Sequence, residues 1–363
     1  GNVRRHACAV PVRLGSVRAR IPGGTAGDVH WLHLRSLTEP QALEQAVDTL
    51  ALIVGKPDFP PAAFERERPR MLVGLQAVRQ SPDELGNRAF YRALYGNHPY
   101  GSPPDGTEES LARIERQHVI DFYNRYYSSG NVVIAIVGAI DRAQAEALAE
   151  RISGALPQGP AAPPLPPVTP RGERHEEQVP FNSAQTHILI GQPALKRDDE
   201  DIFAFMVGNH VLGGGGLVSL LTSTMRDKHG LSYSTSSHFV PSAQPGPFVI
   251  STQVRNDSAD RAIEVLREVF LDFLHNGPTP RQLELAKRNI TGGFPLNLNS
   301  NRKIVGYLSS IGFYRLPLDY LDTYLERIEA VTAEDVRRAF QRHIDPDTLV
   351  IVRVGPQQEA PAQ

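Results

Sequence analysis

Apolar residues recur at helix and strand spacing on both sides of a proline-rich stretch, and the two sides share a pattern. Residues 119–138 (VIDFYNRYYSSGNVVIAIVG) align without a gap with residues 336–355 (VRRAFQRHIDPDTLVIVRVG). Both segments run from the end of an amphipathic helix, through a short polar turn, into a β-branched strand that ends at glycine. The pattern predicts the same helix–strand unit at the end of each half.

Two further pairs of helices support a repeat. Residues 46–50 match residues 262–266, and proline in the first turn opens the next helix at Pro61 and at Pro280. The buried faces of the first pair are predicted to carry Leu43, Val47 and Leu50, and Ile263, Leu266 and Phe270. The offset stays at about 216–219 residues. We therefore predict an α+β fold of two homologous repeats, each a mostly antiparallel sheet backed by helices.

The proline-rich stretch itself, residues 157–170 (PQGPAAPPLPPVTP), has more proline than a helix or a central strand tolerates. It predicts an N-terminal α+β unit over 1–156, a linker over 157–172 and a C-terminal α+β unit over 173–363. The alternative is a long surface loop within one domain.

The N-terminal unit is shorter than its counterpart. About 75 residues separate the linker from a strand near 248–254, whereas about 30 precede the matching strand near 31–35, so about 40 residues are lacking. Such a unit would leave apolar surface uncovered. Either a partner covers that surface, or the sequence omits part of the natural polypeptide, as the irregular stretch 13–27 favours.

A run of four glycines follows a predicted strand over 185–191 and a helix that starts at Ile202. The helix is expected to stop at Gly213, and Gly213, Gly214, Gly215 and Gly216 lack side chains, so another backbone can approach closely. One alternative is a helix C-cap with a flexible turn. A phosphate loop is disfavoured, because no Gly-Lys-Ser/Thr follows.

A second helix is predicted after the glycines from the spacing of Leu217, Leu220, Leu221 and Met225. Gly230 ends it, Arg226 falls in its last turn, and Tyr233 falls in the strand that follows. Both side chains can donate hydrogen bonds to a peptide carbonyl, and the arginine charge stabilises negative charge on that oxygen. Alternatively, Arg226 compensates the helix dipole and Tyr233 packs in a sheet.

Composition narrows the functional classes. The 363 residues have a formal net charge of −2 and no basic run, so a nucleic-acid partner is not expected, and no apolar stretch is long enough to span a bilayer. Cys8 is the only cysteine, which excludes an intrachain disulfide and a cysteine-based zinc cluster. His30 and His33 have no acidic neighbour to complete a ligand set, and the acidic residues 198–201 are typical of a helix N-terminus.

Taken in order, the motifs resemble those of pitrilysin/insulinase-type zinc peptidases, a family that includes mitochondrial processing peptidase. The strongest part of the resemblance is residues 212–216 followed by 225–234. The other landmarks are residues 59–60, 64–68, 95–101, 122–123 and 131–138 in the first half, and 209–214, 316–320 and 330–332 in the second. The resemblance covers nearly the whole chain and implies the half-clamshell fold of these peptidases.

The metal-binding half of the family's site is missing. Members bind zinc through H-x-x-E-H, whose glutamate is the general base, and through the last glutamate of an E-R-x-x-x-x-x-E pattern. No H-x-x-E-H occurs here, and matching Glu67-Arg68 to the second pattern puts Gly74 at the ligand position. The resemblance therefore implies no metal ligands and no cofactor in this chain, and no peptide hydrolysis by the chain alone.

Some family members are two-chain enzymes in which one subunit carries zinc and the other supplies an arginine and a tyrosine. The resemblance implies that Arg226 and Tyr233 act at the zinc of a homologous H-x-x-E-H partner on peptide substrates, and that Gly213 to Gly216 lie along the substrate. The alternative is an inert pseudo-peptidase, like the core subunits of respiratory complexes in this family. Analogy with exported bacterial relatives favours the periplasm over the cytoplasm.

Overall fold

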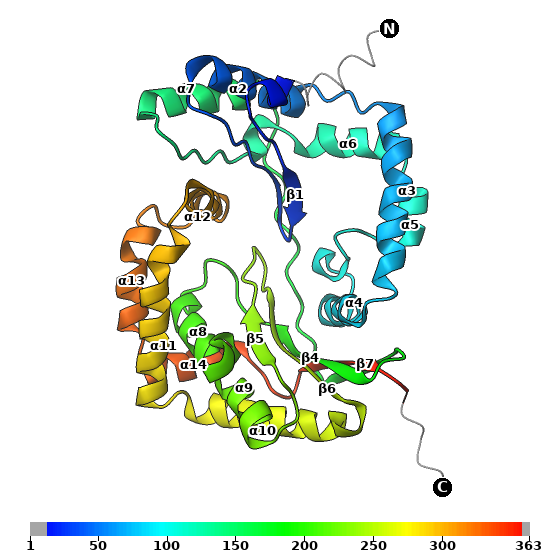
Figure 1. Cartoon of the computed structure of the whole chain (residues 1–363), viewed down its shortest axis with the longest axis vertical. Helices are drawn as coiled ribbons and strands as arrows, with labels where there is room; N and C mark the ends of the chain where they lie inside the picture. Colours follow the sequence, from blue (N-terminus) through cyan, green and yellow to red (C-terminus); the bar gives the residue numbers. More distant parts are fainter. Residues whose placement is uncertain (1–12, 358–363) are drawn as a thin grey trace. The chain divides into compact units, whose positions relative to one another are not determined.

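The computed structural model describes residues 13–357, so Cys8 lies outside the described residues. The chain forms two compact units. Unit 1 consists of the residues up to 75 together with 104–164 and 298–316, and unit 2 of 76–103, 165–297 and the residues from 317 onwards. The chain passes from one to the other several times, as the colours in Figure 1 allow the reader to follow.

Unit 2 is built on a five-stranded sheet with the order β3-β7-β4-β6-β5. Only β3 and β7 run parallel, and the other neighbours are antiparallel. The strands are β3 (His175–Pro180), β4 (Gln185–Pro193), β5 (Thr235–Phe239), β6 (Pro247–Arg255) and β7 (Val350–Gly355). The strands predicted over 185–191, 248–254 and 350–355 are confirmed.

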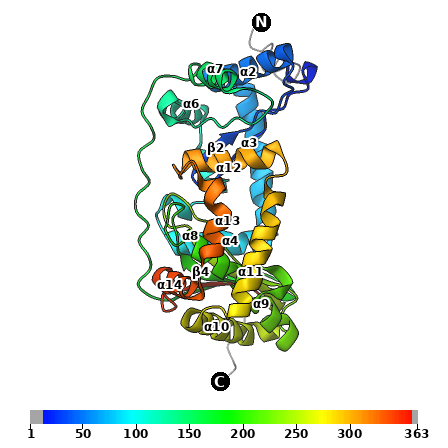
Figure 2. The same cartoon turned by 90° about the vertical axis from the view of Figure 1, so that its left-hand side faces the viewer.

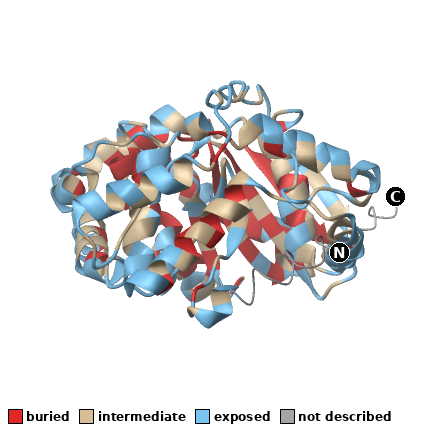
Figure 3. Cartoon of the chain, turned by 90° about the horizontal axis from the view of Figure 1, so that it is seen from above, coloured by how far each residue is buried: buried red, intermediate tan, exposed pale blue. Residues whose placement is uncertain are grey.

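Helices cover this sheet and supply a core of stacked aromatic rings. The ring of Phe205 stacks on that of Phe340 with centroids 4.1 Å apart, and Phe248 stacks on Phe270. The helices are α4 (Pro82–Tyr95), α8 (Ile202–Asn209), α9 (Leu220–Thr222), α10 (Ala259–Asn276), α11 (Pro280–Gly293), α13 (Tyr320–Ala330) and α14 (Ala333–His343), with short helical turns η1 (Pro99–Gly101), η3 (His210–Gly214), η4 (Gly216–Val218), η5 (Ser223–Lys228), η6 (Asn256–Ser258) and η7 (Phe294–Asn297). Figure 3 shows buried residues concentrated on the strands and on one face of the helices.

Helix α4 comes from the N-terminal part of the chain and packs on the sheet of unit 2. Phe90 and Leu94 are buried in one cluster with Val352 and Val354 of β7. The compact units thus mix segments from both sides of the proline-rich stretch. The division into 1–156, 157–172 and 173–363, and the repeat from which it comes, stay predictions.

Unit 1 contains a two-stranded antiparallel sheet and several helices. A small core of Leu50, Val54 and Leu156 holds the helices together. The elements are β1 (Gly23–Ala26), β2 (Val29–Leu32), α2 (Pro40–Gly55), α3 (Pro61–Val78, whose last turn belongs to unit 2), α5 (Glu108–Arg113), α6 (Arg116–Tyr126), η2 (Ser129–Asn131), α7 (Arg142–Ser153) and α12 (Asn301–Phe313). The predicted buried face of α2 is confirmed at Val47 and Leu50, and Leu43 is half-buried.

The strand predicted at the end of 119–138 is wrong. Residues 132–138 form no strand, and Val133 is 49% exposed. Their counterpart in the alignment is β7, which pairs with β3 on one side and β4 on the other. Strands β1 and β2 pair with each other, and no strand among residues 13–357 pairs with the β-branched segment. The strand predicted near 31–35 is observed earlier, as β2.

The proline-rich stretch 157–170 has neither helix nor strand, as expected from its composition, and Figure 2 shows it as an extended trace. One passage from unit 1 to unit 2 falls inside it, between Pro164 and Leu165. Within residues 13–357, no helix is both long enough and apolar enough to cross a lipid bilayer.

Candidate functional site

The two segments with candidate site residues both form π-helical turns. The first helix was predicted to stop at Gly213. Helix α8 instead ends at Asn209 and continues as the π-helix η3, which includes Gly213 and Gly214. The second predicted helix is a single α-turn, α9, that widens into the π-helix η5 with Arg226. Such widened turns are frequent at functional sites.

Gly213 allows a close approach between η3 and strand β5. A β-carbon at this position would lie 2.3 Å from the backbone nitrogen of Ser237, closer than any real side chain permits. The backbone that approaches Gly213 is therefore this chain's own. Gly216 differs, since its φ is +65° and nothing lies within 4 Å of where its β-carbon would be. Of these two glycines, only Gly216 leaves room for another molecule.

The turn between Arg226 and Tyr233 is closed by one carbonyl. Met225, which is fully buried, accepts backbone hydrogen bonds from Leu231 at 2.8 Å and from Ser232 at 3.4 Å. Gly230, predicted as the helix end, has a φ of +61° and donates to the carbonyl of Arg226. The strand begins only at residue 235, so Tyr233 lies in the turn before it and not in the strand as predicted.

This reversal brings Arg226 and Tyr233 together. The guanidinium carbon lies 4.8 Å from the centroid of the phenol ring, a cation–π contact. The residue Tyr233 is 77% exposed and the Arg226 side chain 38% exposed, so both are accessible to another molecule. At such an exposed site the contact itself stabilises the fold by only about 0.5–1 kcal/mol. Nothing in unit 2 buries the phenol, which argues against sheet packing as its role.

Apolar side chains beside the glycines are also exposed. Leu217 was predicted to lie in the same helix as Met225, but residues 216–218 form a separate turn, η4, before α9 begins, and Leu217 is 61% exposed. Val218 is 85% exposed. Leu221 and Met225, by contrast, are fully buried.

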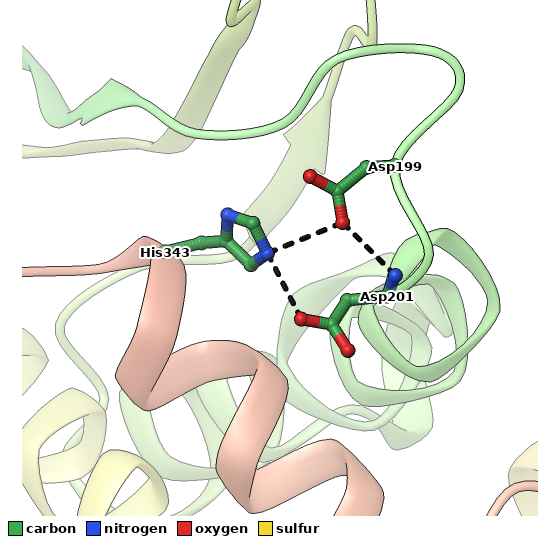
Figure 4. Close-up of side chains that lie close together, drawn as sticks. All are labelled: Asp199, Asp201 and His343. Carbon is green, nitrogen blue, oxygen red and sulfur yellow. Dashed lines mark hydrogen bonds and ion pairs between the residues drawn. The ribbon is translucent and has the colours of Figure 1, made fainter.

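A group of three side chains has metal-ligand chemistry, namely Asp199, Asp201 and His343 (Figure 4). The His343 Nε2 atom lies 3.0 Å from a carboxylate oxygen of Asp201 and 3.3 Å from one of Asp199. Arg342 reaches the same Asp201 oxygen at 3.0 Å. The side chains of His343 and Arg342 thus already bind these carboxylates.

Helix dipoles favour the same arrangement. Asp201 is the N-cap of α8, and His343 is the last residue of α14, so the acids lie at a positive helix end and the bases at a negative one. We interpret the cluster as a clasp between α8 and α14. The prediction that residues 198–201 carry helix N-terminal charge agrees with it, while the link to His343 lies 142 residues away and no local pattern indicated it.

Comparison with known proteins places these features in a family. A profile described as "Peptidase M16 inactive domain" matches residues 113–290. The crystal structure of a peptidase M16 inactive domain from Pseudomonas fluorescens is 36% identical, with a TM-score of 0.93, and the match covers 97% of this chain and 84% of that one. This chain belongs to the M16 peptidase family.

Curated M16 relatives carry two kinds of description. An uncharacterized zinc protease of Streptomyces coelicolor is 28% identical over 75% of this chain and 60% of its own length. A non-peptidase homolog of Helicobacter pylori is 22% identical over 86% of this chain and 72% of its own length. The match thus spans less than two thirds of the length of the Streptomyces coelicolor relative. The match to the inactive domain and to the non-peptidase homolog supports an M16 pseudo-peptidase.

The structure shows the surroundings of Gly74, the residue at which the resemblance predicts the loss of a zinc ligand. Gly74 lies in helix α3, and no atom lies within 4 Å of where its β-carbon would be. Glu67, seven residues earlier, pairs with Arg66 and Arg70 on the surface of the same helix. Helix α3 thus has space for a larger side chain at Gly74, and its correspondence to a zinc ligand of the family stays a prediction.

Proposed function

We propose that this chain is the non-zinc subunit of a heterodimeric M16 zinc peptidase. On this proposal, Arg226 and Tyr233 bind the carbonyl of a peptide held at the zinc of a homologous H-x-x-E-H partner. The supporting observation is the exposed contact between the two side chains, 4.8 Å from guanidinium carbon to ring centroid, on a tightly closed turn. A guanidinium and a phenol both donate hydrogen bonds, and the fixed positive charge stabilises the oxyanion as it develops.

The segment beside this pair suits an extended peptide. Gly216 has no side chain and open space around its β-carbon position, and Leu217 and Val218 expose apolar surface next to it. Large contiguous apolar patches on a soluble surface mark interaction sites, and these two neighbouring side chains would contribute to such a patch. We therefore propose unfolded peptides or short protein segments as the substrates, with residues 213–216 along their path.

The metal has to come from another chain on this proposal. The sequence contains no H-x-x-E-H, and Gly74 supplies no ligand in α3. The clasp of Asp199, Asp201 and His343 is a poor substitute, because Arg342 already binds the Asp201 carboxylate. A periplasmic location stays a prediction.

An inert pseudo-peptidase is the second candidate, and the description of the Helicobacter pylori relative as a non-peptidase homolog favours it. Such a subunit would bind peptides or hold a complex together without influence on the rate of hydrolysis. Exposure of Arg226 and Tyr233 in one contact favours assistance in catalysis, since a scaffold does not require this pair.

The test is reconstitution with an H-x-x-E-H homolog. Each chain is purified alone, its zinc is measured, and hydrolysis of a quenched fluorescent peptide is followed for each chain and for the mixture. We expect no hydrolysis and no stoichiometric zinc for this chain alone, and a mixture far more active than the partner by itself. A mixture that forms a complex but gains no activity would favour the inert subunit, and stoichiometric zinc in this chain alone would refute the proposal.

A further inference from the structure

Buried polar side chains are concentrated in the part of the sequence that contains Tyr233. Of the thirteen buried polar side chains among the described residues, nine lie between Asn209 and Thr252. A buried hydroxyl without a hydrogen bond costs free energy, so such groups are retained where they are bonded to one another. Their concentration in one part of unit 2 indicates a constraint other than packing.

Three of these residues form a hydrogen-bonded chain across strands β5 and β6 that ends at the backbone of Ser234 in the turn. The Thr235 and Thr252 hydroxyls are 2.8 Å apart, Thr252 donates to the Ser232 hydroxyl at 2.8 Å, and Ser232 donates to the Ser234 carbonyl at 2.7 Å. Each hydroxyl has one hydrogen, so the chain runs in one direction and Thr235 is its first donor. The Ser234 amide donates back to Ser232 at 3.2 Å. Tyr233 lies between the two residues that the chain fixes.

The other end of the chain reaches the glycine-rich segment. The Thr222 hydroxyl donates to the Thr235 carbonyl at 2.6 Å. The Thr222 amide donates to the Ser219 hydroxyl at 3.4 Å, and the Ser219 hydroxyl donates to the Gly216 carbonyl at 2.8 Å. Buried hydrogen bonds therefore connect Gly216 with the turn at Tyr233.

We propose that Thr252 is a positioning residue, which through this chain holds the Gly216 segment and the Tyr233 turn as one rigid surface. Hydrogen bonds in a chain polarise one another, and loss of a central member leaves buried partners unpaired on both sides. The coupling of the two segments stands independently, whereas its consequence for peptide hydrolysis rests on the proposed function.

Two substitutions at one position separate the hydroxyl from the packing. Thr252→Val keeps the shape and removes the hydroxyl, whereas Thr252→Ser keeps the hydroxyl. Ser251→Ala is a matched control, because Ser251 pairs with Ser236 at 3.2 Å across the same two strands. Adjacent strand residues point to opposite faces, so this control removes a cross-strand hydroxyl pair outside the chain.

Hydrogen exchange of backbone amides measures the coupling without a partner protein. We expect Thr252→Val to raise exchange about tenfold or more at residues 232–234 and also at 216–219, as expected for a lost buried hydrogen bond. Thr252→Ser and Ser251→Ala should exchange as wild type does. An effect confined to 232–234, or an equal rise in β4 from general loss of stability, would overturn the proposal.

The rate of peptide hydrolysis in the reconstituted mixture tests the consequence. Thr252→Val should lower kcat severalfold with KM nearly unchanged, and the loss should vanish in a Tyr233→Phe background, because Thr252 acts through Tyr233. The positioning role would be overturned if Thr252→Val lowered kcat equally in both backgrounds. It would also be overturned if Thr252→Val left kcat unchanged while Tyr233→Phe lowered it. Coupled exchange together with a kcat insensitive to Tyr233→Phe would leave the coupling supported and refute the proposed function.

Discussion

At the scale of single residues, two glycines have opposite surroundings. A β-carbon on Gly213 would lie 2.3 Å from the backbone of Ser237, whereas one on Gly74 would meet nothing within 4 Å. The sequence indicated that both positions matter, but it could not distinguish a glycine required by packing from one that has only lost a carboxylate. The difference depends on residues distant in the sequence, and it can be tested by substitution.

Gly213→Ala is expected to lower the free energy of unfolding by about 1–3 kcal/mol, because the added methyl group pushes η3 away from β5. Urea denaturation of the purified chain measures it. A neutral result would show that the two segments are not in close contact.

Gly74→Ala should change the free energy of unfolding in the opposite direction. The position is inside helix α3, has open space, and has no positive φ, so alanine should stabilise the chain by about 0.5–1 kcal/mol. The same denaturation experiment serves, with Gly213→Ala as the contrast. Destabilisation by Gly74→Ala would mean that α3 needs a glycine for packing.

At the scale of elements, the sequence predicted strands β4, β6 and β7 of unit 2. It also predicted most of the buried faces of helix α10 in unit 2 and helix α2 in unit 1. It missed the π-helical turns η3 and η5, because apolar spacing at Leu221 and Met225 fits either kind of turn. It also placed Leu217 in the same helix as Met225, and Tyr233 in a strand. These errors all lie at the candidate site, where local geometry departs from regular periodicity. The clasp to His343 and the hydroxyl chain through Thr252 link residues that no local pattern connects.

The clasp between α8 and α14 should contribute to stability. His343→Phe keeps an aromatic ring beside Phe205 but removes the hydrogen-bonding nitrogen from Asp199 and Asp201, and it should lower the free energy of unfolding by about 1–3 kcal/mol. Arg338→Ala, which removes a surface ion pair on the same helix, should change it by less than about 1 kcal/mol. Equal effects of both substitutions in thermal or urea denaturation would contradict the interpretation.

The N-terminus of α14 should make stability depend on acid. The hydrogen bond from the Thr332 hydroxyl holds the pKa of Asp335 below its usual value of 3.8. Because the folded-state pKa is the lower one, the stabilisation is complete above 3.8 and is lost as the pH falls through the folded pKa. Asp335→Asn should remove this part of the acid sensitivity. The free energy of unfolding is measured by urea denaturation between neutral and acidic pH for wild type and Asp335→Asn. The same pH dependence in both proteins would show that the Thr332–Asp335 hydrogen bond contributes nothing.

At the scale of the whole molecule, the α+β class and the M16 family could be read from the order of the motifs. The sequence did not reveal that residues 132–138 form no strand. A β-branched segment becomes a strand only where neighbouring strands accept its hydrogen bonds. Helix α4 packs on the sheet of unit 2 through Phe90 and Leu94, a long-range contact that no repeat in the sequence indicates. Division of labour between two chains is the central claim at this scale.

The most direct test of that claim is kcat for the peptide substrate in the reconstituted heterodimer with single substitutions at the exposed pair. Arg226→Ala and Tyr233→Phe should each lower kcat by about 10²–10³-fold, the usual loss for one oxyanion donor, with wild-type zinc content and complex formation. Lys228→Ala, which removes an exposed cation from the same turn, should leave kcat unchanged. If kcat is insensitive to both substitutions at Arg226 and Tyr233 in an intact, active complex, this chain does not assist catalysis.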